Sequence, residues 1–580
     1  MLKKFKKQKT VNRNRERFFL KNLGLNLCLI TVVVMSTSLN SSHGFLNLDY
    51  IGISEVLQIL LLCFILAFFV TLFLGLFFTE ENRLSHLVVS MFTLTLLLLY
   101  QDITNSTSTL LGDIAVKNNF LYRALYLLFI LMAILVFSLV ENRLKAKHAH
   151  IARNAYVGLG VALVIMATFN VSRVVAHLVS VRYQENIYPN SIESGATTKV
   201  SFLPNIYYIV LDRYSSNEQL EKSLNYDNSQ FTNNLKSLGF YLDDNAYSAY
   251  PYTAQSIAST LNADYLNSYK ESLSSKQQTY NALFSASKNS SVAKELKKLG
   301  YQYHIIGNWY ATSNGSKYAD KVHWGGAKLN LGLFKMKLTE FEDLFLSKNF
   351  ITGILRKIGV YESNHENQVL QQLKVLEQYA KLENGSKQGK FIFTHLLLPH
   401  PPYVFNANGS LSDASIEPGS NGELVTQKYL NQLNFTNSKI LPIIKKIINN
   451  SKGKAIVVLL SDEGFYPQER IGNLGKSTGD ENMLNWSDED LRAKYGILAA
   501  YHLPKVATQD IEKYANSVNI FRVILNRYFG YKLPYLPKCN FTLTEGVGKP
   551  LEFGDITNRL GGLDSMRCSQ LVSGKTSILR

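Results

Sequence analysis

Acidic residues follow two apolar segments that lie far apart in the sequence. NIYYIVL (205–211) is followed by Asp212, and AIVVLL (455–460) leads through Ser461 to Asp462 and Glu463. Both segments are typical of buried strands, and α/β proteins bind ligands beyond the carboxyl ends of such strands. The three carboxylates could therefore converge as oxygen ligands for a divalent cation. The alternative is that each acid only caps a helix or a turn.

A threonine stands at the start of an expected helix. In AYPYTAQSIASTLNADYL, Pro251 precedes a helical pattern from about Ala254, which makes Thr253 a natural N-cap. A hydroxyl there faces free backbone N–H groups, which is also where a phosphate prefers to bind. Thr253 is therefore a candidate nucleophile, and a capping threonine without chemistry is the alternative. Ser256 and Ser259 add hydroxyls one turn apart.

Two histidines follow another apolar segment. THLLLPHPPYVFNANG contains His395 and His400, with three prolines at positions 399, 401 and 402. The prolines fix the backbone around His400 and exclude a helix. Such rigidity suits a histidine that positions a ligand, whereas a surface histidine without a role is the alternative.

A sheet is needed to bring these residues together. Strand-like segments at 205–211, 301–306, 391–396, 455–460 and 495–501 alternate with helical patterns at 291–300, 366–382 and 518–529. Continuous apolar strands that alternate with amphipathic helices predict an α/β fold, in which helices sandwich a mostly parallel central sheet.

The first 180 residues have a different composition from the rest. Five apolar segments, near 22–39, 56–78, 85–100, 121–140 and 154–178, approach the length that a membrane-spanning helix needs. They predict a basic tail (1–21), an α-helical membrane domain (22–180), a linker (181–203), an extracytoplasmic domain (204–535) and a C-terminal extension (536–580). The alternative for the first segment is a cleaved signal peptide, although no small-residue cleavage site stands out.

The distribution of charge predicts the orientation. Residues 1–21 carry nine Lys and Arg against one acid, and the loop at 141–153 is also basic, so both are expected in the cytoplasm. Five crossings then place residue 185 onward outside the inner (cytoplasmic) membrane. The net charge is +17, of which +10 belongs to residues 1–184, where anionic lipid is the natural partner. Without any nucleic-acid signature elsewhere, we expect no nucleic-acid partner.

Four cysteines divide between the two halves. Cys28 and Cys63 lie in apolar segments and are expected to pack there, whereas Cys539 and Cys568 lie in the part expected outside the membrane. In an oxidising compartment these two could form a disulfide that contributes about 3 kcal/mol by loop closure. Two unpaired thiols are the alternative.

Five motifs in order resemble a known family. They are LD-x-Y (211–214), YP-x-TA-x-S (250–256), LLPHPP-Y-x-F (397–405), SD-x-G (461–464) and VN-x-FR-x-ILN-x-YFG (518–530). Over residues 200 to 535 the chain resembles the membrane-anchored sulfatase-like branch of the alkaline phosphatase superfamily. Lipoteichoic acid synthase, phosphoglycerol transferases and phosphoethanolamine transferases belong to that branch.

The resemblance implies roles for individual residues. Asp212 and Asp462 match metal ligands, Thr253 matches a nucleophile that also binds the metal, and His400 matches a histidine that contacts the phosphoryl group or the leaving oxygen. Glu463 stands where the common motif Asp-His-Gly has histidine, and it is expected as a further ligand. The residues expected at the substrate are Ser256, Asn308, Trp309 and His395.

An oxygen-only ligand set would favour manganese or magnesium over zinc. We therefore expect one divalent metal ion as the cofactor. The motif C/S-x-P-x-R, whose cysteine or serine is converted to formylglycine in true sulfatases, does not occur in the sequence. Sulfate-ester hydrolysis by that route is therefore not expected.

The function expected from the sequence is a membrane-anchored transferase of phosphoryl-alcohol groups, of the phosphoglycerol or phosphoethanolamine type. A membrane phospholipid would be the donor, and a cell-envelope glycan or lipid would be the acceptor. The alternatives are a phosphodiester hydrolase that uses the same site and an inactive envelope-assembly protein, for which Glu463 in the motif is the main argument.

Overall fold

The computed structural model describes nine ranges and isolated positions outside them. The ranges are 203–269, 279–332, 334–338, 352–362, 365–382, 388–412, 421–467, 482–543 and 552–572. The expected tail, membrane segments and linker lie outside the nine ranges except for residue 203, and the structure otherwise describes only isolated residues of the membrane segments and the linker. Among the described residues, no helix is both long and apolar enough to cross a membrane. The chain forms two compact units, Met1–Arg182 with Lys328–Glu362, and Tyr183–Ala327 with Ser363–Arg580.

A seven-stranded mixed sheet forms the centre of the second unit. Its order is β2 (Tyr241–Leu242), β10 (Ala499–His502), β9 (Ile456–Leu460), β1 (Ile206–Leu211), β8 (Lys390–Leu396), β3 (Gln302–Gly307) and β4 (Lys321–Trp324). The five strands from β9 to β4 are parallel, whereas β10 runs antiparallel to both β9 and β2. The carboxyl ends of β9, β1, β8 and β3 therefore meet at one edge.

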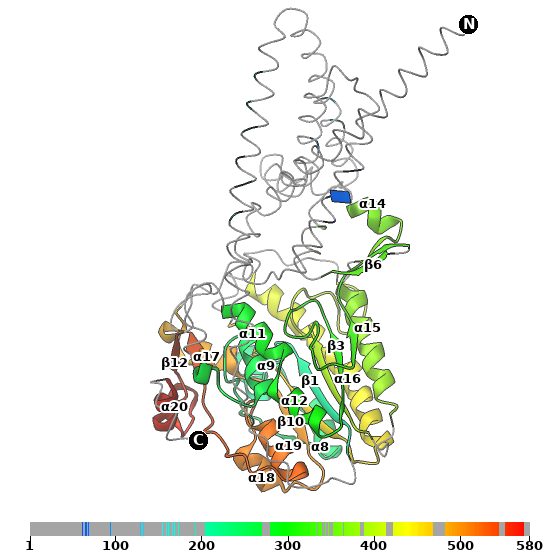
Figure 1. The fold of residues 1–580 in the computed structure, drawn as a ribbon. Helices are drawn as coiled ribbons and strands as arrows, with labels where there is room; N and C mark the ends of the chain where they lie inside the picture. Colours follow the sequence, from blue (N-terminus) through cyan, green and yellow to red (C-terminus); the bar gives the residue numbers. More distant parts are fainter. Residues whose placement is uncertain are drawn as a thin grey trace, which may run out of the picture. The chain divides into compact units, whose positions relative to one another are not determined.

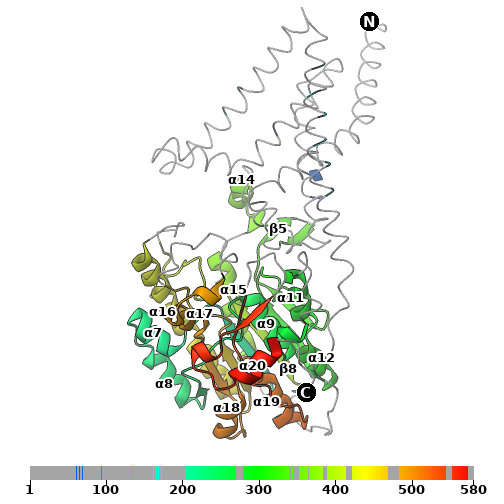
Figure 2. The ribbon, with the colours of Figure 1, turned by 90° about the vertical axis from the view of Figure 1, so that its left-hand side faces the viewer.

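Helices cover both faces of this sheet (Figures 1 and 2). Alternate residues of β1 enter separate apolar cores, because successive side chains of a strand point to opposite faces. One core contains residues of α7 (Asn217–Leu224), α8 (Ser229–Ser237), α15 (His365–Tyr379) and α16 (Gly422–Asn450). The other contains residues of α9 (Thr253–Asn262), α12 (Ser291–Lys298), α18 (Thr508–Tyr514) and α19 (Ile520–Phe529), and α11 (Thr279–Lys288) packs on α9.

The predicted α/β fold is confirmed, with one wrong strand boundary. The predicted helices at 291–300, 366–382 and 518–529 correspond to α12, α15 and α19 within a few residues. The predicted strand at 495–501 begins too early. Helix α17 (Asp488–Tyr495) reaches Tyr495, and β10 begins at Ala499 and pairs antiparallel to β9.

The other unit contributes a small antiparallel sheet. It contains β6 (Phe334–Lys337), β5 (Lys328–Leu331) and β7 (Tyr361–Glu362) in that order, with helix α14 (Thr352–Lys357) before β7.

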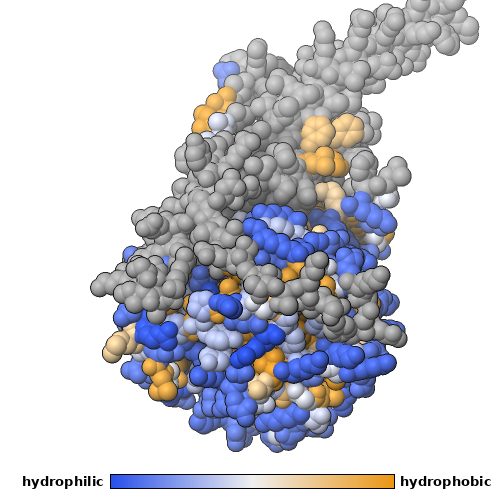
Figure 3. Space-filling model, turned by 60° about the horizontal axis from the view of Figure 1, so that its bottom comes forward, coloured by the Kyte–Doolittle hydropathy of each residue, from blue (hydrophilic) through white to orange (hydrophobic). Residues whose placement is uncertain are grey.

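In the second unit, the described residues in the foreground of Figure 3 are mostly hydrophilic, with small scattered apolar groups. This pattern is typical of a surface that faces water.

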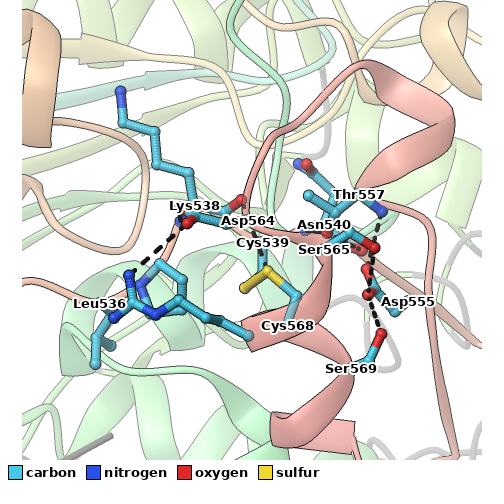
Figure 4. The surroundings of a disulfide bond; sticks show 12 residues. Leu536, Lys538, Cys539, Asn540, Asp555, Thr557, Asp564, Ser565, Cys568 and Ser569 are labelled. Carbon is cyan, nitrogen blue, oxygen red and sulfur yellow. Dashed lines mark hydrogen bonds and ion pairs between the residues drawn. A yellow bond between two sulfur atoms is a disulfide. The ribbon is translucent and has the colours of Figure 1, made fainter.

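A disulfide fixes the C-terminal extension (Figure 4). Cys539 lies just before β11 (Phe541–Leu543), Cys568 lies in α20 (Ser565–Val572), and their sulfur atoms are bonded at 2.06 Å. Strand β11 pairs with β12 (Phe553–Asp555). The predicted pairing of the two cysteines is therefore present in the structure.

The extension also supports the chain just before α9. The backbone N–H of Phe541 donates to the carbonyl of Ala249 (2.9 Å), and the amide of Asn540 donates to the carbonyl of Ser248 (2.8 Å). The ring of Tyr250 packs against the rings of Phe541 and Phe553, at 5.8 and 5.3 Å between centroids. Residues 248–250, which lead to Thr253, are thus held by the last part of the described chain.

Candidate active site and metal centre

Three buried residues meet at the carboxyl edge of the sheet. Asp212 directly follows β1, Asp462 lies two residues after β9, and His395 lies in β8 opposite Val210 of β1. Each offers one potential ligand atom, and these atoms lie within 4.8 Å of one another. The parallel strand order accounts for this convergence of residues that are up to 250 positions apart in sequence.

Two carboxylate oxygens of this cluster lack a partner. Nε2 of His395 lies 3.1 Å from Oδ2 of Asp212, and Oδ1 of Asp462 accepts from the backbone N–H groups of Arg213 (3.2 Å) and Glu463 (3.0 Å). Among the described residues, the buried atoms Oδ1 of Asp212 and Oδ2 of Asp462 have no hydrogen-bond partner. Buried unpaired oxygens are costly, and a divalent cation would satisfy both. The cluster therefore fits a metal ion.

The two aspartates have pKa values that move in opposite directions. Burial acts to raise the pKa of Asp212, but His400, His395 and Arg213 together hold it at about 2. The pKa of Asp462 is raised well above its usual range, first by burial and then by the charges of Asp212 and Glu463. Without a cation, the site therefore resists having both carboxylates ionised.

Thr253 lies beside this cluster and is not the helix cap. Helix α9 begins at Thr253 itself, and the N-cap is Tyr252, which makes no side-chain capping bond, so the predicted cap was one residue off. The half-buried Thr253 hydroxyl is instead close enough to the Asp462 carboxylate to lower its pKa. Ser256 donates its hydroxyl to the carbonyl of Tyr250 (3.0 Å) and so stabilises the turn before Thr253.

Glu463, predicted as a metal ligand, has a different environment. Its Oε1 accepts from Nε of Arg213 at 2.5 Å, and its Oε2 accepts from Nζ of Lys494 at 2.7 Å. Both oxygens are therefore engaged by cations. The third position beside Asp212 and Asp462 belongs to His395, which sequence reasoning had placed at the substrate.

His395 is held by residues on the neighbouring strand and helix. Asn308, which follows β3, donates to the carbonyl of His395 (2.9 Å), and its amide nitrogen lies 3.2 Å from Nδ1 of the ring. The hydroxyl of Ser313 lies 3.1 Å from the same Nδ1, and Gln372 of α15 donates to the His395 carbonyl (2.9 Å). Such partners fix the orientation of a metal-binding imidazole. Asn308, which was predicted to contact the substrate, thus holds His395 in this structure.

The remaining predicted residues lie around this centre. His400 is linked electrostatically to Asp212; burial lowers the pKa of His400, although Asp212 acts to raise it. The ring of Trp309 packs against Tyr310 (5.7 Å), whose ring in turn packs against His395 (6.3 Å). Trp309 is thus one ring removed from the cluster.

Sequence reasoning missed several residues of the site. Arg213, Lys494 and Ser313 make the contacts described above, and His365 has an unpartnered buried Nε2 among the described residues. Burial, followed by the charge of His400, lowers the pKa of His365 to about 4. Arg213 could have been found because it lies inside the LD-x-Y motif. Lys494 lies in a segment that carries no motif, whereas Ser313 lies in the segment of Asn308 and Trp309, which were predicted at the substrate.

Comparison with known proteins identifies the family. The family model described as "Sulfatase" matches residues 204–531, which is more than half of the chain. The chain belongs to the sulfatase family. Sulfatase-family enzymes are metal dependent, and the buried Asp212, His395 and Asp462 group is where this member could hold an ion.

Solved structures to which the chain is similar include two EptC domains and a lipoteichoic acid synthase. The C-terminal periplasmic domain of EptC from Escherichia coli is 14% identical, with 63% of this chain and 97% of that chain covered and a TM-score of 0.38. The corresponding domain of phosphoethanolamine transferase EptC from Campylobacter jejuni is 16% identical (59% and 94%, TM-score 0.33). Lipoteichoic acid synthase LtaP from Listeria monocytogenes is 11% identical (69% and 97%, TM-score 0.34). A search of curated proteins found no match.

Proposed function

We propose that this sulfatase-family protein transfers a phosphoryl-alcohol group from a membrane phospholipid to an acceptor outside the cytoplasmic membrane, with Thr253 as the nucleophile. One observation carries the proposal. Thr253 is the first residue of its helix and not the cap, and its hydroxyl interacts with Asp462, in a buried cluster where two carboxylate oxygens have no hydrogen-bond partner among the described residues. A threonine beside a metal site is the arrangement expected of an activated hydroxyl nucleophile.

The proposed reaction has two steps. A bound divalent cation supplies positive charge that favours the ionised hydroxyl and neutralises phosphate oxygens. Oγ of Thr253 attacks phosphorus, the bond from phosphorus to the diacylglycerol oxygen breaks, and a phosphodiester to Thr253 forms. His400, neutral because burial lowers its pKa, relays the hydroxyl proton to the leaving oxygen. An acceptor hydroxyl then attacks the same phosphorus, the bond from phosphorus to Oγ of Thr253 breaks, and His400 relays the acceptor's proton to Oγ.

The donor atoms bear on the identity of the metal. Asp212, Asp462 and Thr253 offer oxygen, which suits manganese or magnesium, whereas His395 offers a nitrogen that is more typical of a transition metal. Manganese is a transition metal that also accepts oxygen ligands, so we propose manganese in preference to magnesium. The expected membrane anchor would confine the enzyme to the surface that contains its lipid donor and so raise their effective concentration.

The test uses the full chain in detergent. Phospholipids with glycerol or ethanolamine headgroups are added with manganese, magnesium or zinc, and diacylglycerol release is measured together with the mass of the Thr253 peptide. We expect metal-dependent release and a phosphoryl-alcohol adduct on Thr253, both lost in Thr253→Ala.

Thr508→Ala is the matched control. Thr508 also stands first in a helix, α18, behind a residue that makes no side-chain capping bond, but it is exposed on the surface. If no lipid yields diacylglycerol with any metal, the transferase proposal fails. Release of the free phosphorylated alcohol, with nothing passed to an added acceptor, would instead identify a hydrolase.

A further inference from the structure

A chain of buried charges lies beside the metal centre. The Glu463 side chain is 2% exposed and joins Arg213 on one side to Lys494, which is 1% exposed, on the other. The ammonium group of Lys494 also lies over the rings of Tyr252 and Tyr466, at 5.1 and 5.7 Å from their centroids. The Lys494 side chain is thus buried, and its ammonium group holds one carboxylate oxygen of Glu463 in place.

Arg213 is held at three points. Its backbone N–H donates to Asp462, its carbonyl accepts from the hydroxyl of Tyr429 (2.9 Å), and its Nε donates to Glu463. Its φ is +60°, a left-handed conformation that costs energy for a residue with a side chain. Such a conformation persists only where the surroundings impose it, and it is common at active sites.

The end of the Arg213 side chain remains available. The side chain is 18% exposed, in contrast to those of Glu463 and Lys494. Within the described part of the chain, the hydrogen bonds of the guanidinium group use only Nε, so both terminal amino groups are without a partner. Its charge acts on both Asp212 and His400, so it lies near a candidate metal ligand and near the histidine expected at the leaving oxygen.

The charges of the site also point to an anion. With a divalent cation bound, Asp212, Asp462 and Glu463 contribute −3, Arg213 and Lys494 contribute +2, and the cation contributes +2, so the sum is +1. A buried net charge is unfavourable unless a partner neutralises it. A single negative charge completes the balance, and a phosphodiester carries one.

We propose that Arg213 binds the non-bridging oxygens of the phosphodiester through its terminal amino groups, and that Glu463 is a positioning residue for Arg213 and not a metal ligand. A guanidinium group fixed at Nε presents a planar pair of donors that matches two phosphate oxygens. The identity of the anion rests on the proposed function, whereas the roles of Arg213 and Glu463 rest on their contacts alone.

The test separates metal binding from anion binding in the full chain in detergent. Metal content is measured by elemental analysis, and affinity for dimethyl phosphate, a stable monoanionic diester, is measured by calorimetry on the manganese-loaded protein. We expect Arg213→Lys to keep the metal and to weaken dimethyl phosphate binding at least about tenfold, because lysine keeps the charge but lacks the paired donors. Glu463→Gln should also keep the metal and weaken anion binding, whereas Asp212→Asn should lose the metal.

Matched variants guard against misfolding. Arg527→Lys alters an arginine–carboxylate pair on the surface, between Arg527 and Asp510, and should change neither the metal content nor the affinity for dimethyl phosphate. If Glu463→Gln unfolds because Lys494 loses its partner, Glu463→Gln combined with Lys494→Met removes both charges. Loss of metal from folded Glu463 variants would overturn the proposal, as would unchanged anion affinity in Arg213→Lys. Because no turnover is measured, these outcomes are independent of whether lipid transfer occurs.

Discussion

At the scale of single residues, the site places two carboxylates together and leaves one oxygen of each for a ligand. Asp212 stays ionised because cationic and histidine neighbours hold its pKa at about 2, whereas burial and two nearby acids raise the pKa of Asp462. This opposition means that binding of a cation and ionisation of Asp462 favour each other. We therefore expect the free energy of unfolding of the metal-free protein to be lowered at neutral pH by the unfavourable ionisation of Asp462, and we expect no such loss in the metal-loaded protein.

Asp462→Asn should remove this loss of stability, because asparagine cannot ionise. A folded-state pKa above the unfolded value contributes stability at acid pH, and this contribution is lost as the pH rises through the folded-state pKa. We expect the metal-free variant to be more stable than the metal-free wild type at neutral pH, by about 1 kcal/mol, and to lose activity and metal binding. Thermal unfolding across a pH series, with and without manganese, measures this. A metal-free variant less stable than wild type at neutral pH would contradict it.

Sequence reasoning found the residues that follow structural rules. Asp212 and Asp462 were predicted because they follow strands, and Thr253 because it begins a helix. It did not find that Glu463 is paired on both sides, since that depends on Lys494, 31 positions away, and on the conformation of Arg213. His395 was expected at the substrate, and its place beside Asp212 was not foreseen, because the register of β8 against β1 decides which side chains reach Asp212.

At the scale of elements, the C-terminal extension supports the segment that leads to Thr253, the proposed nucleophile. Strand β11 is bonded to residue 249, and aromatic rings from β11 and β12 enclose Tyr250. The periodic elements of the sheet were predictable because each buries a continuous apolar face. Helix α16 was not predicted, because it is long and mixed in character. The disulfide of this extension was expected, but its short strands β11 and β12 were not.

Loss of the disulfide should affect both stability and activity. Cys539→Ser with Cys568→Ser is expected to reduce the free energy of unfolding by about 3 kcal/mol through loop closure. Because β11 supports residues 248–250, turnover should fall as well. Thermal unfolding and diacylglycerol release, with and without reductant, test this. Cys28→Ser with Cys63→Ser is the control, and an unfolding midpoint that reductant leaves unchanged in wild type would contradict the prediction.

At the scale of the whole molecule, more than half of the net charge of +17 belongs to the part of the chain with apolar segments. If the basic tail and the loop at 141–153 are cytoplasmic, the site must be outside. This placement agrees with a disulfide in the same domain, since disulfides persist in oxidising compartments.

The orientation can be measured in intact cells. We expect protease added to spheroplasts to digest a tag placed after residue 580 and to spare a tag placed before residue 1. Both tags should be digested after the membrane is permeabilised, and the full chain should remain with the membrane after an alkaline wash. Protection of the C-terminal tag in intact spheroplasts would contradict the expected topology.

The support that β11 gives to residues 248–250 has a consequence for the order of synthesis. Thr253, the proposed nucleophile, and the three residues of the metal cluster are translated before residue 463, but the support for residues 248–250, which lead to Thr253, arrives only with residues 540–568. Domains are completed from the N-terminal side as the chain is made. If a membrane phospholipid is the donor, as proposed above, the nascent chain should therefore remain inactive beside its substrate until its last strands have been exported and their disulfide has formed.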